Sequence, residues 1–189
     1  GAGSGDNAAR IAEALRARYS GTTVEVSNDA TNLLASGKSD GDSAALICGT
    51  GSIIYVKRGD ELLRIGGWGH LLDEGGSAYD IGRDALRVLL AAEEGTATFG
   101  VLCRLTLERL GAESAHSALS ELYKKDKTAV SSLAPAVFEA DELGDSIARA
   151  IIIKNIGVIQ KKLSDARSAF GAHGEIVCGG GLFNSKTFC

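Results

Sequence analysis

The chain contains 189 residues, of which 44% are hydrophobic and 23% are charged, and its formal net charge is −4. That size and balance fit a globular protein with one sizeable core or two small lobes, while the acidic charge and the lack of a basic run argue against a nucleic-acid-binding surface. No apolar run is long enough to cross a membrane, and the four cysteines lack the close spacing of a zinc or iron–sulfur site. We therefore expect a cytoplasmic protein with reduced thiols, no metal held by its own side chains, and neither nucleic acid nor membrane as a partner.

The first part of the chain predicts a helix, a strand and a second helix. Apolar residues recur at helical spacing over residues 8–19, and the β-branched residues of 22–26 favour a strand. That strand would deliver Asn28 and Asp29 at its carboxyl end. One of these two residues would then cap a helix over residues 30–35.

Three short β-type runs follow, at residues 44–48, 52–57 and 61–65. A turn at 49–51 joins the first two and a turn at 58–61 joins the last two, so the sequence predicts three consecutive antiparallel strands. Cys48 and Cys178 each end a short apolar run, where a cysteine usually behaves as a small buried hydrophobe.

The remainder of the chain is predominantly helical. A glycine-rich loop at 66–77 leads to a helix at about 78–94, and residues 99–163 are mostly helical, with Pro135 expected in the first turn of one helix. A final strand at 175–178 runs into three glycines. The order predicts an α/β fold with a mixed sheet and a helical block.

Carboxylates and glycines mark four candidate site segments. Asp29 follows a predicted strand, at the sheet edge where α/β proteins bind ligands, so it could act as a base or simply cap a helix. The turn at 49–52 could point backbone N–H groups at a phosphate, although it lacks the lysine and the helix of a Walker A loop and could be only a tight turn.

The loop at 66–77 carries the only tryptophan of the chain between glycines. An exposed indole is suited to one face of a sugar ring, and Asp73 and Glu74 could accept hydrogen bonds from its hydroxyls. In the alternative, Trp68 is a core residue and the two carboxylates cap the next helix. The glycines at 179–181 could lie against a nucleotide or could form an ordinary turn.

Together these motifs resemble the N-acetylglucosamine kinase branch of the BadF/BadG/BcrA/BcrD ATPase family, within the actin-like sugar kinase and heat-shock chaperone superfamily. The residues that carry the resemblance are SNDA (27–30), CGTGS (48–52), GGWGHLLDEGGSAYDIGR (66–83), the segment from SLAPAVFEA to GD (132–145) and IVCGGG (176–181). The resemblance implies actin-like, ribonuclease H-like lobes with ATP and sugar in the cleft between them. Residues 1–35 would end the N-terminal lobe, and residues 36–189 would belong to the C-terminal lobe.

On the sugar side, the resemblance implies that Asp29 is the catalytic base. Substrate contacts are then expected from Asn28, Gly67, Trp68, Gly69, Asp73 and Glu74. The family usually reads LLGDEGS where this chain reads LLDEGGS. We prefer Asp73 as the carboxylate that contacts the sugar, although Glu74 holds that place in an ungapped alignment.

On the nucleotide side, the resemblance implies ATP with Mg²⁺ as cofactors. Thr50 matches the threonine of the family's phosphate loop. Ala134 falls near an adenine-side contact, and the adenosine loop includes the last glycines of the chain. The expected ATP-binding residues are Gly49, Thr50, Gly51, Ser52, Ala134, Gly180 and Gly181.

Both ends of the sequence look cut. The family begins with a DGGGT-type hairpin that grips the phosphates, an upstream Asn helps to hold the sugar, and a helix follows the adenosine loop. None of these is among the 189 residues. Phosphoryl transfer depends on positioning and charge neutralisation, so we expect this segment alone to phosphorylate poorly or not at all.

The resemblance predicts ATP-dependent phosphorylation of an amino sugar, with N-acetylglucosamine at its 6-hydroxyl as the first choice. For the oligomeric state of the protein, we consider a homodimer. Two alternatives stay open. One is an ATPase that activates a reductase or dehydratase in the same family, which would hold an iron–sulfur cluster between subunits through cysteines, and the other is a non-catalytic sugar-binding protein.

Overall fold

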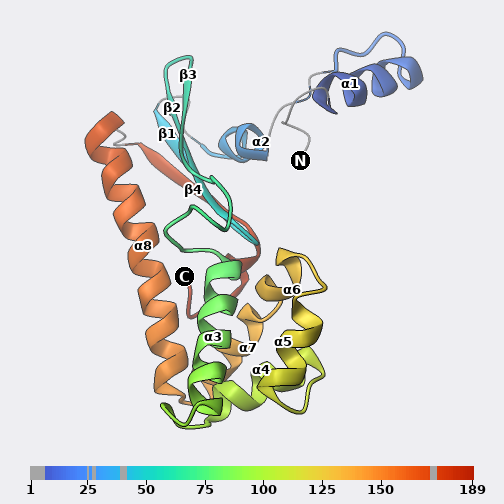
Figure 1. The fold of residues 1–189 in the computed structure, drawn as a ribbon. Coiled ribbons are helices and arrows are strands. Elements are labelled where there is room, and N and C mark those ends of the chain that lie inside the picture. The colour runs from blue at the N-terminus through green and yellow to red at the C-terminus, as the bar shows by residue number, and fades with distance from the viewer. Residues whose placement is uncertain (1–6, 25, 27–28, 39–41, 171–173) are drawn as a thin grey trace.

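The computed structural model describes residues 7–24, 26, 29–38, 42–170 and 174–189. A twisted sheet and a block of helices stand end to end, and the long helix α8 (Ser146–Phe170) runs along both (Figure 1). This arrangement confirms the predicted α/β fold with a mixed sheet and a helical block. None of the helices in the described ranges is both long and apolar enough to span a membrane.

The first two predicted helices are present, but the strand between them is not. The helices are α1 (Asn7–Arg18) and α2 (Asp29–Ala35). The strand predicted at 22–26 is wrong for residues 22–24 and 26, which form neither helix nor strand, while residue 25 lies outside the described part of the chain. The β-branched residues favour an extended backbone, but a strand also needs a neighbour for its ladder of hydrogen bonds.

The sheet has four strands in the order β3-β2-β1-β4. The first three pair in antiparallel fashion, as predicted, whereas β4 pairs with β1 in parallel, with Leu46 opposite Cys178. The carboxyl ends of β1 and β4 therefore meet at one edge of the sheet. The strands are β1 (Ser43–Cys48), β2 (Ser52–Arg58), β3 (Glu61–Gly66) and β4 (Glu175–Gly179).

Five shorter helices complete the helical block beside α8. Ser77 caps α3 in a capping box with Asp80, since the Ser77 hydroxyl accepts from the Asp80 N–H and the Asp80 carboxylate accepts from the Ser77 N–H. Pro135 lies in the first turn of α7, which confirms that prediction. The helices are α3 (Ala78–Glu93), α4 (Val101–Leu110), α5 (Ala115–Leu122), α6 (Lys127–Ser131) and α7 (Ala134–Glu142), and a 3₁₀ turn, η1 (Gly181–Asn184), follows β4.

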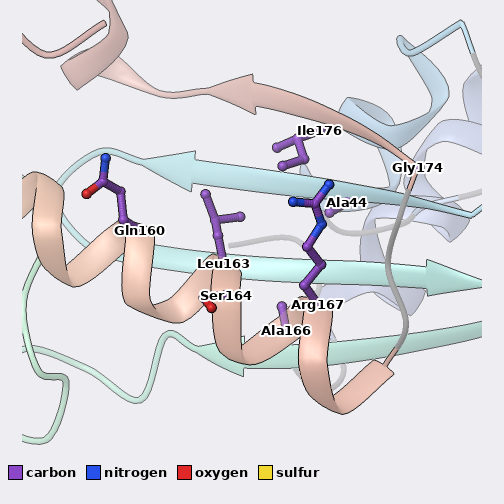
Figure 2. A pocket seen from close by; sticks show the side chains of 8 residues that line it. All are labelled: Ala44, Gln160, Leu163, Ser164, Ala166, Arg167, Gly174 and Ile176. Carbon is purple, nitrogen blue, oxygen red and sulfur yellow. The ribbon is translucent and has the colours of Figure 1, made fainter.

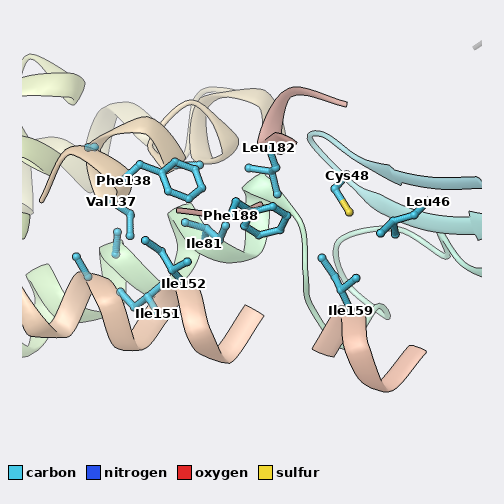
Figure 3. Packing of buried hydrophobic residues seen from close by; sticks show 14 of the residues in the cluster. Leu46, Cys48, Ile81, Val137, Phe138, Ile151, Ile152, Ile159, Leu182 and Phe188 are labelled. Atoms are coloured by element: carbon cyan, nitrogen blue, oxygen red, sulfur yellow. The ribbon is translucent and has the colours of Figure 1, made fainter. Parts of the chain in front are cut away.

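A continuous apolar core joins the sheet to the helical block. Side chains from α3, α7 and α8 interdigitate with Leu182 and Phe188 near the C-terminus, and Ile159 of α8 continues the cluster toward Leu46 and Cys48 of β1 (Figure 3). Such a core fixes the end of β1 relative to the start of α3. The candidate site lies at this junction.

The predicted division into residues 1–35 and 36–189 stays a prediction. In Figure 1, α1 lies apart from the sheet. The second helix, α2, packs against β1 and β4, and the Lys38 N–H that follows it donates to Glu175 Oε2 (2.8 Å).

Candidate active site

The 49–52 turn (residues 49–52) joins β1 to β2 at the edge of the sheet that faces the helical block. The N–H of Gly49 donates to the carbonyl of Gly51 across the turn (2.9 Å), and the carbonyls of Gly49 and Thr50 accept from Ala78 (2.9 Å) and Tyr79 (3.3 Å) at the start of α3. These bonds fix the turn against the helix and leave Thr50 exposed.

A large cavity of about 960 Å³ opens on one side of this turn. Four of the seven residues predicted to bind ATP line it, namely Gly49, Thr50, Ala134 and Gly181. The rest of the lining comes mainly from α6, α7 and η1, with Phe138 as its aromatic surface and Lys186 as a cation. A volume of this size, with apolar surface from α7 and polar side chains around it, suits a nucleotide.

A small cavity of about 120 Å³ opens on the other side of the same turn. Its lining contains six predicted site residues: Thr50, Gly51 and Ser52 from the turn, and Gly67, Gly69 and Asp73 from the glycine-rich loop. Thr50 lines this cavity as well as the large one. One exposed hydroxyl therefore stands where the two spaces meet. The predicted Gly180 lines neither of them and instead packs on Cys48, because a Cβ at this glycine would lie 2.3 Å from the Cys48 carbonyl oxygen.

The Trp68 loop, which we define as residues 66–77, lies tightly on β2. A Cβ at Gly67 would approach Ile53 Cδ1 to 2.4 Å, and Gly67 has a φ of +73°, so both space and backbone require glycine there. At the other end of the loop, Gly76 has a φ of +85° and a Cβ there would lie 2.7 Å from Ile159 Cγ1. The sequence Gly-Gly at each end thus permits close packing rather than free movement.

Trp68 is 66% exposed, so it is not a core residue. The guanidinium of Arg64 lies 4.5 Å from the centre of its ring. Arg64 also donates to the carbonyls of Gly66 (3.0 Å) and Gly67. The indole does not line the small cavity, whereas the backbone on either side of it does.

The structure distinguishes the two candidate carboxylates of the loop. Asp73 lines the small cavity, and its Oδ2 accepts from the N–H of Gly69 (3.2 Å). Glu74 is exposed and is not part of that lining. Neither residue caps α3, because Ser77 does so. Of Asp73 and Glu74, Asp73 is thus the carboxylate that lines the small cavity.

Two polar residues of α8 hold this loop, and the sequence analysis did not identify either of them. Asn155 is 1% exposed, and its Oδ1 accepts from the N–H of Gly76 (3.0 Å). Lys162 is 6% exposed, and its Nζ donates to the carbonyl of Gly75 (3.1 Å). The signal was present, since both residues interrupt the apolar stripe of an amphipathic helix, where a buried polar residue needs a partner.

The structure does not place Asp29 in the lining of either cavity, and it shows the side chain exposed as the first residue of α2. Leu33 packs on Gly179 and the turn after α2 contacts Glu175, so α2 runs antiparallel to β4. Asp29 lies one helical turn beyond Leu33, about 6 Å further along the axis. Asn28 lies outside the described residues.

The cysteine thiols line neither the large nor the small cavity. Burial raises the pKa of Cys48 to about 12, so this thiol stays protonated at neutral pH. Cys178 is exposed, contrary to the prediction that it is buried. Within the described part of the chain, no three histidine, cysteine, aspartate or glutamate residues form a metal site.

A further cavity, of about 290 Å³, lies between α8 and β4. Arg167 and Ile176 line it, but none of the predicted site residues does (Figure 2).

Comparison with known proteins places this arrangement in a family. All residues from 1 to 189 match the model of the BadF/BadG/BcrA/BcrD ATPase family. The N-acetyl-D-glucosamine kinase of Dictyostelium discoideum is 34% identical over 68% of this chain, and the N-acetylmuramic acid/N-acetylglucosamine kinase of Clostridium acetobutylicum is 31% identical over 71% of it.

A solved structure shows the same fold. A candidate N-acetylglucosamine kinase of Chromobacterium violaceum superposes with a TM-score of 0.76 over 96% of this chain and 63% of its own, at 20% identity. This likeness confirms the actin-like fold class that the sequence predicts. The chain spans 42% and 44% of the length of the two curated relatives. The match over the full 189 residues shows that the chain belongs to the BadF/BadG/BcrA/BcrD ATPase family.

Proposed function

We propose that the whole protein transfers the γ-phosphate of ATP to a hydroxyl of an amino sugar, with N-acetylglucosamine and its 6-hydroxyl as the first choice. Two relatives named as N-acetylglucosamine kinases support the substrate class. The observation that carries the proposal is the position of Thr50, which lines both the large and the small cavity. A phosphoryl group passing from nucleotide to sugar has to cross such a boundary.

The two cavities suggest where the nucleotide and the sugar bind and which residues contact each of them. The nucleotide occupies the large cavity, with its terminal phosphates at the 49–52 turn, where the Thr50 hydroxyl and backbone N–H groups other than that of Gly49 can donate to them. The sugar occupies the side of the small cavity and the Trp68 loop, where Asp73 accepts a hydrogen bond from a hydroxyl. We assign to Asp29, at the start of the helix that packs beside β4, the role of taking the proton from the attacking hydroxyl.

The residues present fit a Mg²⁺ ion that is held chiefly by the nucleotide. Mg²⁺ usually keeps several waters and binds one or two carboxylates together with substrate phosphates. Asp73 and Asp80 are the carboxylates that line the small cavity. Asp80 Oδ1 accepts no hydrogen bond, and it forms an ion pair with Arg83 Nη2 at 3.0 Å. These two residues would hold the ion's water shell, and the ion would neutralise charge on the phosphates.

The assignment of Asp29 is tested with Asp29→Asn in the full-length protein, because this change removes the charge and keeps the shape. ADP release is measured with glucose, glucosamine and N-acetylglucosamine as acceptors. We expect turnover to fall by roughly 10²–10⁴-fold, the usual contribution of a general base, while sugar binding measured by calorimetry is retained. The matched control is Asp60→Asn in the exposed turn between β2 and β3. Undiminished turnover in Asp29→Asn would remove Asp29 from the mechanism.

The activator alternative receives less support from the thiols. An iron–sulfur ligand has to be a thiolate, but Cys48 is buried with its pKa raised to about 12. Iron analysis of the purified protein separates the two functions, since a kinase should contain none. A stoichiometric iron–sulfur absorption band would favour the activator.

A further inference from the structure

We propose that Lys162 is a positioning residue that fixes the Trp68 loop against the 49–52 turn and so orients the sugar-binding carboxylate of Asp73. The inference rests on the proposed function for its consequence in catalysis. The fixing of the loop itself is a separate, measurable property. Lys162 lies on α8, far in sequence from both of the segments that it joins.

The ammonium group of Lys162 meets both segments at once. Its Nζ donates to Ser52 Oγ in the turn (3.2 Å) and to the Gly75 carbonyl in the loop (3.1 Å), and it forms an ion pair with Asp73 Oδ1 (3.8 Å). The Ser52 hydroxyl in turn donates to the Gly75 carbonyl (2.9 Å). Turn, loop and helix are thus linked through one cation.

The burial of the Lys162 ammonium group indicates that it holds Asp73 and the Trp68 loop in one orientation. The side chains of Lys162 and Asp73 are 8% and 10% exposed. Removing an ammonium from water is costly, and an apolar residue could fill the same place with equal or greater stability. A buried ion pair is therefore better evidence for a specified arrangement than for extra stability.

Lys162 acts on the site through Asp73. It lines neither the large nor the small cavity, whereas Asp73 lines the small one, so we assign its effect to the carboxylate. The Asp73 carboxylate is held at both oxygens, since Oδ2 accepts from the Gly69 N–H (3.2 Å) and Oδ1 faces Lys162. Two fixed oxygens give the carboxylate one orientation toward the small cavity, which is what selective hydrogen bonding to a sugar hydroxyl requires.

The first test compares Lys162→Met with Lys161→Met in the full-length protein. Lys161 is its neighbour on α8, but it is exposed and pairs with Asp165 (2.8 Å), so it provides a matched control. We expect Lys162→Met to raise the KM for the sugar by about 10- to 100-fold, as for other misplaced substrate contacts, with a much smaller change in the KM for ATP. Lys161→Met should leave both values unchanged. Equal KM values for the sugar in Lys162→Met and wild type would overturn the inference.

A double-mutant cycle with Asp73→Asn identifies the route of the effect. If Lys162 acts through the carboxylate, Lys162→Met should change the KM for the sugar much less in the Asp73→Asn background than in wild type. Fully additive effects would show that Lys162 does not act through Asp73. Should Lys162→Met fail to fold, Lys162→Gln replaces it in the same cycle, because glutamine keeps a donor for the Gly75 carbonyl and lacks the charge.

Hydrogen exchange separates this inference from the proposed function. We expect Lys162→Met to speed amide exchange in residues 66–77 at least ten-fold while exchange in α4 and α7 stays as in Lys161→Met. That result would support the positioning role even if the wild-type protein released no ADP with any amino sugar, which would refute only the kinase proposal. Unchanged exchange in residues 66–77, or uniformly faster exchange throughout the chain, would refute the positioning role.

Discussion

The large and the small cavity lie on either side of one turn, yet they are built in different ways. The lining of the large cavity comes mainly from polar and apolar side chains of α6, α7 and η1, together with the backbone of the 49–52 turn. The small cavity depends on a loop that has to be held from outside, by Asn155 and Lys162 of α8.

This difference suggests that the residues around the large cavity and the supports of the small cavity control different properties. A cavity lined by separate side chains from several elements can change residue by residue with little effect on its neighbours. A loop held by buried polar side chains loses its shape as a unit when one contact is removed, because the remaining polar groups are left unsatisfied. We therefore expect changes around the large cavity to alter nucleotide affinity alone. Changes in the supports of the small cavity should alter sugar binding and stability together.

The largest effect is expected from Gly76→Ala. The new methyl group would lie 2.7 Å from Ile159 Cγ1, and the φ of +85° is unfavourable for alanine. Overpacking typically costs about 1–3 kcal/mol, so the free energy of unfolding in urea should fall by about that amount and sugar binding should be lost. Gly144→Ala is the control, because Gly144 has a φ of +86° with nothing within 4 Å of its added Cβ. Equal destabilisation by the two variants would show that backbone strain, not packing on α8, is responsible.

Asn155→Ala removes a second support of the same loop. The side chain accepts from the Gly76 N–H (3.0 Å) and donates to the Ile151 carbonyl (3.0 Å), so its loss leaves buried groups without a partner. We expect the free energy of unfolding to fall by about 1–3 kcal/mol, together with a rise in the KM for the sugar. Thermal unfolding followed by circular dichroism measures the first quantity. Gln160→Ala, on the exposed side of the same helix, should change neither, and an Asn155→Ala variant that resembles it would contradict the account.

Gly181→Val tests the other cavity. Gly181 lines the large cavity and nothing lies within 4 Å of an added Cβ, so valine should fit the fold and project into that cavity. We expect the KM for ATP to rise by roughly ten-fold, with an unchanged melting temperature and an unchanged affinity for the sugar. Gly157→Ala, on the exposed face of α8, serves as the control. Weaker sugar binding in Gly181→Val would show that the two cavities are not independent.

The smallest effect is expected from Arg64→Met. Arg64 stacks on Trp68 at 4.5 Å and donates to two loop carbonyls, but it is exposed, so solvent can replace much of each contact. Sugar affinity should fall by no more than about five-fold, since an exposed cation–π contact contributes about 0.5–1 kcal/mol. The emission of Trp68, obtained as the difference from a Trp68→Phe variant, should shift to the red as the ring gains water. An unshifted emission would show that Arg64 does not cover the indole.

The local elements could be predicted because their signals are local. The β-type run at 52–57 and the turn at 58–61 were visible in the sequence, as was the proline at the start of α7. The strand predicted at 22–26 failed because β-branched residues specify an extended backbone but cannot supply a neighbouring strand.

Only part of the candidate site could be predicted. The glycines that line the two cavities stand next to recognisable turns, and Asp73, which lines the small cavity, lies in the glycine-rich loop at 66–77 that the sequence analysis selected. The contact between Lys162 and Ser52 joins residues 110 positions apart. Such a contact depends on how α8 packs against the sheet, which no local pattern encodes. Cys178 was predicted to be buried for a related reason, because the end of an apolar run does not say which side of a strand is covered.

The role of Thr50 as the boundary between nucleotide and sugar is the central claim. The most direct measurement is a crystal structure of the full-length protein with N-acetylglucosamine and a non-hydrolysable ATP analogue. We predict that the terminal phosphate lies within hydrogen-bond distance of the Thr50 hydroxyl, with the adenine between α7 and η1 and the sugar hydroxyls at Asp73. A triphosphate bound away from the 49–52 turn, or a sugar bound without contact to the Trp68 loop, would contradict the account.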